Sequence, residues 1–268
     1  MNITVLANRD LASNIALNLL LPALAQAHKV RVFLSSRVGG SAVAPLELQQ
    51  LKFFEQTLFN ELLFPALQDS STDARLHSFD RLARITDTPP IQVLNKINSE
   101  EGLQSLAATA PDLVLSIRYG GILKDDAIAI PSLGVLNLHS GLLPEYRGVM
   151  ATFYAMLNGE SEIGTTLHYI CDPGIDTGDI IADTRVALKT DHSYLWNVLQ
   201  LYPSGVALML ACVQKISAGE AVAHRPQSKG GDYYSFPTVE QLHRFAEMGL
   251  RLYDVDEATV IAKQYMEL

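Results

Sequence analysis

The chain has 268 residues, of which 48% are hydrophobic and 18% charged, a balance typical of one large or two small globular domains. Its formal net charge of −9 argues against a protein that wraps nucleic acid, because such binding needs a concentrated basic surface. Two cysteines, Cys171 and Cys212, are too few and too far apart for a disulfide framework or a paired-cysteine zinc site. We therefore expect free thiols and no metal.

An apolar stretch near the start, residues 15–26, could pass for the core of a signal peptide. The segment before it carries Arg9 beside Asp10 and reads as a strand rather than as a positively charged leader. No apolar run reaches the roughly 20 residues that cross a bilayer. We therefore expect a cytoplasmic protein without a membrane partner.

The opening elements alternate between strand and helix patterns. The expected order is a buried strand at 3–7, a helix at 11–26 kinked by Pro22, and a strand at 29–34. This order predicts the start of a doubly wound, mostly parallel α/β sheet. The glycine-rich dinucleotide fingerprint is absent, since Asn8-Arg9-Asp10 stands where its glycines would be, so we expect no nicotinamide cofactor.

The next part of the chain combines an apolar helical pattern with two further strands. Residues 46–66 predict a long helix or helix pair, whose apolar face fits core packing or a homodimer interface better than a ligand groove. Strands are expected at 91–94 and 112–117, with a helix between them that Ser99 caps and that ends near Pro111. A glycine pair follows the second strand in Arg118–Leu123, where it permits either close approach to a ligand or simply a tight turn.

The second half of the chain continues the strand and helix patterns without an obvious linker. We expect a central strand at 135–139, a helix at 149–158 with Phe153, Met156 and Leu157 inward, and strands at 165–170 and 179–186. A long helix at 193–217 and two helices at 238–248 and 254–266 complete the order. Between them, Tyr233, Tyr234 and Phe236 either stack on a base or cover the core, and we favour the core.

Three polar residues stand out along this pattern. Asn137 and His139 are two positions apart, so they face the same side of a strand and, at its end, the ligand crevice of an open sheet. An amide and an imidazole side by side can stabilise an oxyanion in acyl transfer. Asp176, held between two glycines, can orient His139 and accept a proton. The structural alternatives are buried polar groups satisfied in the core and a turn aspartate.

The stretch from residue 134 to residue 178 resembles the folate-dependent formyltransferases, including the methionyl-tRNA, glycinamide ribonucleotide and amino-sugar enzymes. These share Asn-x-His-x-Ser-Leu-Leu-Pro, then Arg-Gly, then Asp-x-Gly. The matching residues here are Asn137, His139, Leu142, Leu143, Pro144, Arg147, Gly148, Asp176 and Gly178. Gly141 stands where the family usually has Ser, a departure that weakens any analogy to one member's substrate. The match is strong over residues 112–186.

The resemblance implies a Rossmann-like formyltransferase core over residues 1–219 and a short helical C-terminal extension over 220–268. It also implies formyl transfer from 10-formyltetrahydrofolate to an amine, with Asn137, His139 and Asp176 as the catalytic residues. The pterin of the donor is expected against two segments, one formed by Tyr119, Gly120, Gly121, Ile122 and Leu123, the other by Cys171, Asp172 and Ile175. His168 and Arg147 are second-tier candidates.

The acceptor remains open at this level. The tRNA enzymes carry a further basic β-barrel domain, whereas the tail here is helical and the chain acidic, so we expect a small-molecule amine and no nucleic acid. A nucleotide-linked amino sugar and a hydroxyornithine-like amine are the leading choices, with methionyl-tRNA less favoured. The alternatives are a formyltetrahydrofolate hydrolase and a non-catalytic folate-binding protein.

Overall fold

Seven strands form one mixed sheet in a computed structural model that describes residues 1–36, 44–67, 74–228 and 230–266. The strand order is β3-β2-β1-β4-β5-β7-β8, and all neighbours from β3 to β5 pair in parallel, whereas β7 and β8 are antiparallel. The strands are β1 (Asn2–Asn8), β2 (Lys29–Ser35), β3 (Gln92–Val93), β4 (Leu113–Ile117), β5 (Val135–His139), β7 (Glu162–Ile170) and β8 (Ile180–Ala187). The doubly wound, mostly parallel sheet is confirmed.

The sequence predicts residues 135–139 as the central strand. This strand, β5, lies inside the sheet, but the middle strand of the seven is β4. It pairs with β4 in parallel and with β7 in antiparallel orientation, so it stands where the pairing changes direction. Both neighbours bury the strand, which accounts for its apolar residues Val135, Leu136 and Leu138. The polar Asn137 and His139 are therefore held on a rigid internal element.

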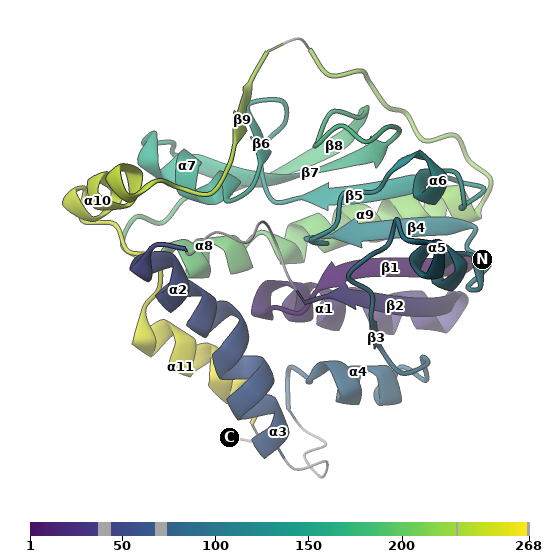
Figure 1. Ribbon diagram of the computed structural model, residues 1–268, viewed down its shortest axis with the longest axis horizontal. Helices are drawn as coiled ribbons and strands as arrows, with labels where there is room; N and C mark the ends of the chain where they lie inside the picture. The colour runs from purple at the N-terminus through teal and green to yellow at the C-terminus, as the bar shows by residue number, and fades with distance from the viewer. Residues whose placement is uncertain (37–43, 68–73, 229, 267–268) are drawn as a thin grey trace.

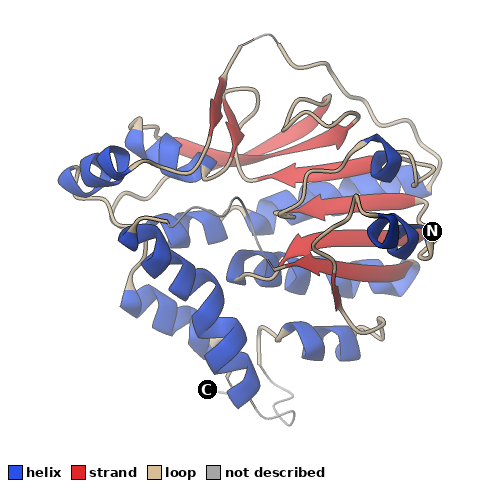
Figure 2. Ribbon diagram, viewed as in Figure 1, coloured by secondary structure: helices blue, strands red, loops and turns tan. Residues whose placement is uncertain are grey.

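Helices cover both faces of the sheet (Figures 1 and 2). On one face, α1 (Leu11–Ala27) packs beside α9 (Tyr202–Ser217), and on the other lie α5 (Glu100–Ala107) and α6 (Asp125–Ile128). Alternate strand residues serve the two layers: Val5 belongs to the core under α1 and α9, and Leu6 to the core under α5 and α6.

Several helices differ in detail from the expected ranges. The 46–66 segment is helical but has three parts, α2 (Leu46–Lys52), the π-helix η1 (Phe53–Leu63) and α3 (Phe64–Ala66). The expected helix at 193–217 is divided into α8 (Tyr194–Leu199) and α9, with a turn before Pro203. The expected strand at 91–94 shrinks to the two-residue edge strand β3, and α4 (Phe79–Ile85) precedes it.

By length and composition, the α8–α9 stretch is apolar enough to cross a membrane. In this fold, however, the helix α9 contacts α1, β5, β7 and β8. Its buried side chains include Tyr202, Val206, Met209 and Val213. This packing accounts for the apolar character of the stretch.

The C-terminal segment packs on the same core. The helix α10 (Val239–Glu247) places Phe245 against Phe153 of α7 (Ala151–Leu157), with ring centroids 4.5 Å apart. The strand β9 (Asp232–Tyr234) pairs in parallel with β6 (Tyr146–Gly148), a second small sheet that the sequence did not predict. Between α9 and β9 the chain crosses one edge of the main sheet (Figure 1), and we name its residues 220–228 the strap.

The aromatic residues of the tail divide into two groups. Tyr234 stacks between Tyr146 and Tyr154, with ring centroids 5.6 and 4.1 Å away, so it covers the core. Tyr233 is 55% exposed and Phe236 is 43% exposed. The expected covering role thus holds for Tyr234.

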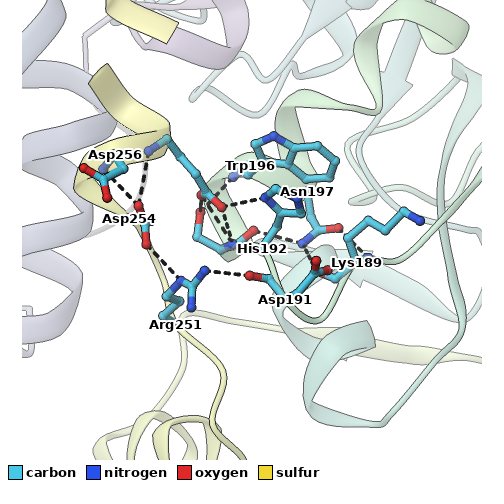
Figure 3. A network of polar contacts seen from close by, with 10 residues as sticks. Lys189, Asp191, His192, Trp196, Asn197, Arg251, Asp254 and Asp256 are labelled. Atoms are coloured by element: carbon cyan, nitrogen blue, oxygen red, sulfur yellow. Dashed lines mark hydrogen bonds and ion pairs between the residues drawn. The ribbon is translucent and has the colours of Figure 1, made fainter. Parts of the chain in front are cut away.

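A polar network attaches the last helix, α11 (Val255–Lys263), to the turn before α8 (Figure 3). The carboxylate of Glu257 accepts hydrogen bonds from the Ser193 hydroxyl and amide, and it lies 2.7 Å from His192 Nδ1. The Ser193 hydroxyl also caps α8 by accepting from the Trp196 amide. The C-terminal extension is therefore fastened to the core by polar as well as apolar contacts; its division from the core at residue 219 stays a proposal.

Candidate active site

The sheet brings Asn137, His139 and His168 together. Asn137 faces His168 directly across the β5–β7 pair, and its Nδ2 donates to His168 Nε2 at 3.0 Å. The other ring nitrogen of His168, Nδ1, donates to the Tyr169 carbonyl at 2.9 Å. His168, a second-tier candidate from the sequence, is thus a direct partner of Asn137.

Asp176 completes this cluster from the loop between β7 and β8. Its Oδ1 lies 3.4 Å from Asn137 Nδ2 and 3.5 Å from His168 Nε2. Its Oδ2 accepts from the Gly148 amide at 2.9 Å and lies 3.4 Å from His139 Nδ1. The side chain is only 10% exposed. The structure therefore joins all three residues that the sequence singled out.

The backbone at Asp176 is unusual, because its φ of +54° lies in the left-handed region. A turn aspartate that bonds only its own loop was the structural alternative. The residue that makes hydrogen bonds within this loop is Asp172, whose Oδ1 accepts from the Gly174 amide and the Thr177 hydroxyl. The carboxylate of Asp176 is thus left to face β5 and β7.

The electrostatics of the cluster favour a negative Asp176. Burial alone raises the pKa of its carboxyl group, but the imidazoles of His139 and His168 and the Gly148 amide outweigh that effect and lower the pKa to about 2. Asp176 is therefore ionised at neutral pH.

His139 has both ring nitrogens directed at oxygen atoms. Its Nε2 lies 2.7 Å from the Tyr146 carbonyl, and because a carbonyl only accepts, Nε2 carries a hydrogen. Its Nδ1 faces Asp176. In this arrangement His139 is held between Tyr146 and Asp176 rather than directed at an open oxyanion position.

Gly141 makes this position of His139 possible. A Cβ atom at residue 141 would lie 2.6 Å from Ala151 Cβ, 2.7 Å from His139 Nε2 and 2.9 Å from the Tyr146 carbonyl. Thr166 holds the turn in place, donating to the Gly141 carbonyl and accepting from the Leu143 amide. The departure from the usual Ser is therefore coupled to the geometry of His139.

Part of the chain is similar to a known protein family. Residues 81–195 match the family model described as formyl transferase. Over these residues, the chain is similar to the formyl transferase family.

Its curated relatives include two methionyl-tRNA formyltransferases. The protein from Kosmotoga olearia is 35% identical over 131 residues, which are 49% of this chain and 42% of that protein. The protein from Pelotomaculum thermopropionicum is 31% identical over 165 residues, 61% of this chain and 51% of that protein. The chain thus spans about half the length of these relatives.

Solved structures share the formyltransferase fold. An N-formyltransferase from Helicobacter canadensis, in complex with folinic acid and dTDP-3-aminofucose, has a TM-score of 0.58 and 20% identity, covering 96% of this chain and 85% of that one. Glycinamide ribonucleotide transformylase 1 from Symbiobacterium toebii has a TM-score of 0.54 and 16% identity, covering 84% and 93%. At these identities the likeness concerns the fold.

The first segment that the sequence predicts to hold a pterin follows β4. The Tyr119 hydroxyl donates to the Leu94 carbonyl, and the Gly120 amide donates to the Ser35 hydroxyl at 2.8 Å. Gly121 is tightly packed, because a Cβ there would lie 2.9 Å from the Tyr119 ring. Ile122 is 53% exposed and Leu123 is buried. This segment leaves one apolar side chain, Ile122, available to a flat ring.

The second segment is the outer part of the Asp176 loop. Cys171 and Asp172 are exposed, and Ile175 is half-buried. Its position beside Asp176 follows from the chain itself, whereas contact with a pterin stays a proposal. Arg147 points elsewhere: its Nη2 donates to the Gly231 carbonyl at 3.2 Å.

Two contributors to the site escaped sequence reasoning. The Gly148 amide donates to Asp176, and a backbone donor has no residue-type signal. Gln227 of the strap donates to the carbonyls of Asp176 and Gly178, and nothing in its local sequence marked it. Over the described ranges, no group of three or more His, Cys, Asp or Glu side chains could hold a metal ion.

Proposed function

We propose that this protein transfers a formyl group from 10-formyltetrahydrofolate to an amine. The observation that carries the proposal is the buried cluster in which Asp176 meets Asn137, His139 and His168. The similarity of residues 81–195 to the formyl transferase family supports it, as do structures of the same fold named as complexes with folinic acid or 5-N-formyl-THF.

The proposed reaction uses the cluster to manage charge and a proton. The free amine attacks the formyl carbon, negative charge develops on the formyl oxygen, and the bond between that carbon and the folate nitrogen then breaks. The Asn137–Asp176 contact, at 3.4 Å, is the weakest contact of the amide. One N–H of Asn137 can therefore turn to the formyl oxygen while the other stays on His168.

Asp176 acts mainly by position in this scheme. Because its pKa is about 2, it is a weak base at neutral pH, and general bases work best near the operating pH. We propose that it holds His139 and Asn137 in place by its negative charge. The proton lost by the amine passes through water and the Asp176 carboxylate to the departing folate nitrogen, which leaves as tetrahydrofolate. In this scheme His139 holds the Asp176 carboxylate through its Nδ1, while Asn137 supplies the donor for the developing charge.

For the acceptor we propose a small-molecule amine, either a nucleotide-linked amino sugar or a hydroxyornithine-like amine. The net charge of −9 disfavours a phosphate-rich partner, and a structure of the same fold is named as a complex with dTDP-3-aminofucose. Methionyl-tRNA is the second candidate, because the curated relatives described above are named as methionyl-tRNA formyltransferases.

The test is incubation of the protein with 10-formyltetrahydrofolate and a panel of amines that includes both small-molecule classes and methionyl-tRNA. We expect a formylated small amine, detected by its added mass. Release of formate without any formylated product would contradict transfer and indicate hydrolysis.

The variant Asp176→Asn tests the site. It removes the charge that faces His139 and His168, and we expect transfer to fall by about 10²- to 10⁴-fold. Circular dichroism should show an unchanged fold, since Asn keeps the side-chain volume. Wild-type turnover in this variant would refute the assignment.

A further inference from the structure

Gln227 joins the strap to the loop that carries Asp176. Its Nε2 donates to the Asp176 carbonyl at 2.8 Å and to the Gly178 carbonyl at 2.7 Å. The two hydrogens of one amide thus bridge the backbone on either side of Thr177. The bonds hold a segment that lies 49 to 51 positions earlier in the chain.

The loop needs support from outside. Cys171, Asp172, Pro173 and Gly174 are all exposed, whereas the Asp176 side chain is 10% exposed and its backbone is left-handed. A left-handed backbone is disfavoured for a residue with a Cβ, so surrounding contacts must hold it. The Asp172 bonds organise the outer turn only.

The chain is held on both sides of Gln227, by contacts of the strap before it and by a contact of β9 after it. Before it, Arg225 and Ile180 exchange two backbone hydrogen bonds, each of 2.8 Å, and His224 Nδ1 lies 2.9 Å from an Asp179 oxygen. After it, the Asp232 amide donates to the Glu145 carbonyl at the start of the β6–β9 pair.

The β6–β9 pair reaches Asp176 from the opposite side. Gly148, the last residue of β6, pairs with Tyr234 and donates its amide to Asp176 Oδ2. Gly148 has a φ of +95°, and a Cβ there would lie 2.1 Å from the Tyr234 carbonyl, so β9 packs directly on this residue. The same C-terminal segment therefore contacts both the Asp176 loop and the amide that binds its carboxylate.

We infer that Gln227 is a positioning residue for formyl transfer, which sets the orientation of Asp176 through the backbone without contacting the reacting groups. The inference rests on the proposed function for its catalytic consequence. Without the two amide bonds, the loop would move its carboxylate relative to His139, His168 and Asn137.

The test replaces Gln227 with Met, which keeps the length of the side chain and removes both donors. Gln214→Met, at an exposed glutamine on α9, is the matched control. We expect kcat in Gln227→Met to fall by about 10- to 100-fold, the cost of a misplaced catalytic group. The KM values for donor and amine should change by less than about threefold. The control should keep wild-type kinetics.

A second readout is independent of turnover. Titration of the Asp176 carboxyl carbon by NMR should show its pKa rising in Gln227→Met toward 3.8, because the carboxylate would move away from the imidazoles and the Gly148 amide. Gln214→Met should titrate like the wild type. Thermal unfolding identifies any loss of folded protein.

The outcomes separate the two proposals. An unchanged Asp176 titration in Gln227→Met overturns the positioning role, whether or not activity falls. A shifted titration with unchanged kcat also overturns it, since position would then not matter for transfer. If the wild type transfers no formyl group, the proposed function fails and, with it, the catalytic part of this inference, while the titration still shows whether Gln227 holds Asp176.

Discussion

At the scale of single residues, the site depends on side chains that satisfy one another. Asn137 donates to His168 and to Asp176, and His139 lies between Asp176 and the Tyr146 carbonyl. Buried polar groups without partners are costly, so this mutual pairing lets the sheet hold four polar groups in one place. Because Asn137 already has partners, a substrate that binds its amide has to replace the 3.4 Å contact between Asn137 and Asp176.

Gly141 is the residue at which this chain departs from the family pattern. In Gly141→Ala and Gly141→Ser, the new Cβ would approach His139 Nε2 and Ala151 to less than 3 Å. We expect each variant to lose about 1–3 kcal/mol of stability from overpacking. A drop of about tenfold in kcat should accompany it, since His139 must shift.

Thermal unfolding and steady-state kinetics check this expectation, and the Ala variant separates the Cβ from the hydroxyl. Adding Ala151→Gly should recover part of the stability, because it removes the closest contact. Wild-type kcat in both single variants would show that His139 does not depend on Gly141.

Asp10 lies where a dinucleotide-binding fold would have its glycine-rich turn. Where a dinucleotide-binding fold has glycines, Asp10 caps α1 by accepting from the Ser13 amide at 2.7 Å and accepts from Arg118 Nε at 3.1 Å. The N-terminus of α1, where such folds bind a phosphate, is therefore occupied by the protein's own carboxylate.

At the scale of elements, the π-helix η1 places the carboxyl group of Glu55 beside the buried ion pair of Asp10 and Arg118. Glu55 is 14% exposed, and its Oε1 lies 3.7 Å from Arg118 Nη2. Burial raises its pKa to about 7, although the Arg118 cation lowers it, and Asp10 raises it further. The folded protein therefore binds a proton at Glu55 that the unfolded chain releases above its ordinary pKa of 4.5.

A raised carboxyl pKa destabilises the folded state as the pH rises. Stability from this group is complete below about 4.5 and declines as the pH rises to about 7. We expect Glu55→Gln to match the wild type at pH 4.5 and to be more stable at pH 8, by up to about 3 kcal/mol. Urea unfolding at the two pH values measures it.

The control for this prediction is Glu61→Gln, at an exposed glutamate of the same π-helix. It should leave the pH dependence of stability unchanged. Equal effects of Glu55→Gln at both pH values would contradict the raised pKa.

The C-terminal elements connect structure to the site. The segment after α9 forms the strap, β9 and two helices, and the strap and β9 contact the Asp176 loop and Gly148. The sequence predicted α10 and α11 because capping residues and an apolar periodicity lie within each segment. It could not predict β9, whose three residues acquire their structure only by pairing with β6.

At the scale of the whole molecule, net charge bears on the acceptor. With a net charge of −9, the protein lacks an overall attraction to nucleic acid, and binding to phosphates depends on basic contacts. We expect no gel shift with methionyl-tRNA at about 50 mM salt and about 10 μM protein. A complex at nanomolar concentration, weakened steeply by added salt, would favour tRNA as the acceptor.

The sequence by itself predicted the seven strands of the main sheet, its doubly wound order, and the grouping of Asn137, His139 and Asp176. These follow from local patterns: strand alternation places Asn137 and His139 on one face, and glycine-flanked loops mark turns. Only the tertiary structure showed the contacts of His168, Gly148 and Gln227 and the close packing around Gly141. Their contacts join residues from different elements, up to 51 positions apart in the case of Gln227, and they exist only once the sheet and the strap are packed. The local sequence determines which side chains lie at the end of a strand, and the packing of distant elements determines which hydrogen-bond partners those side chains have.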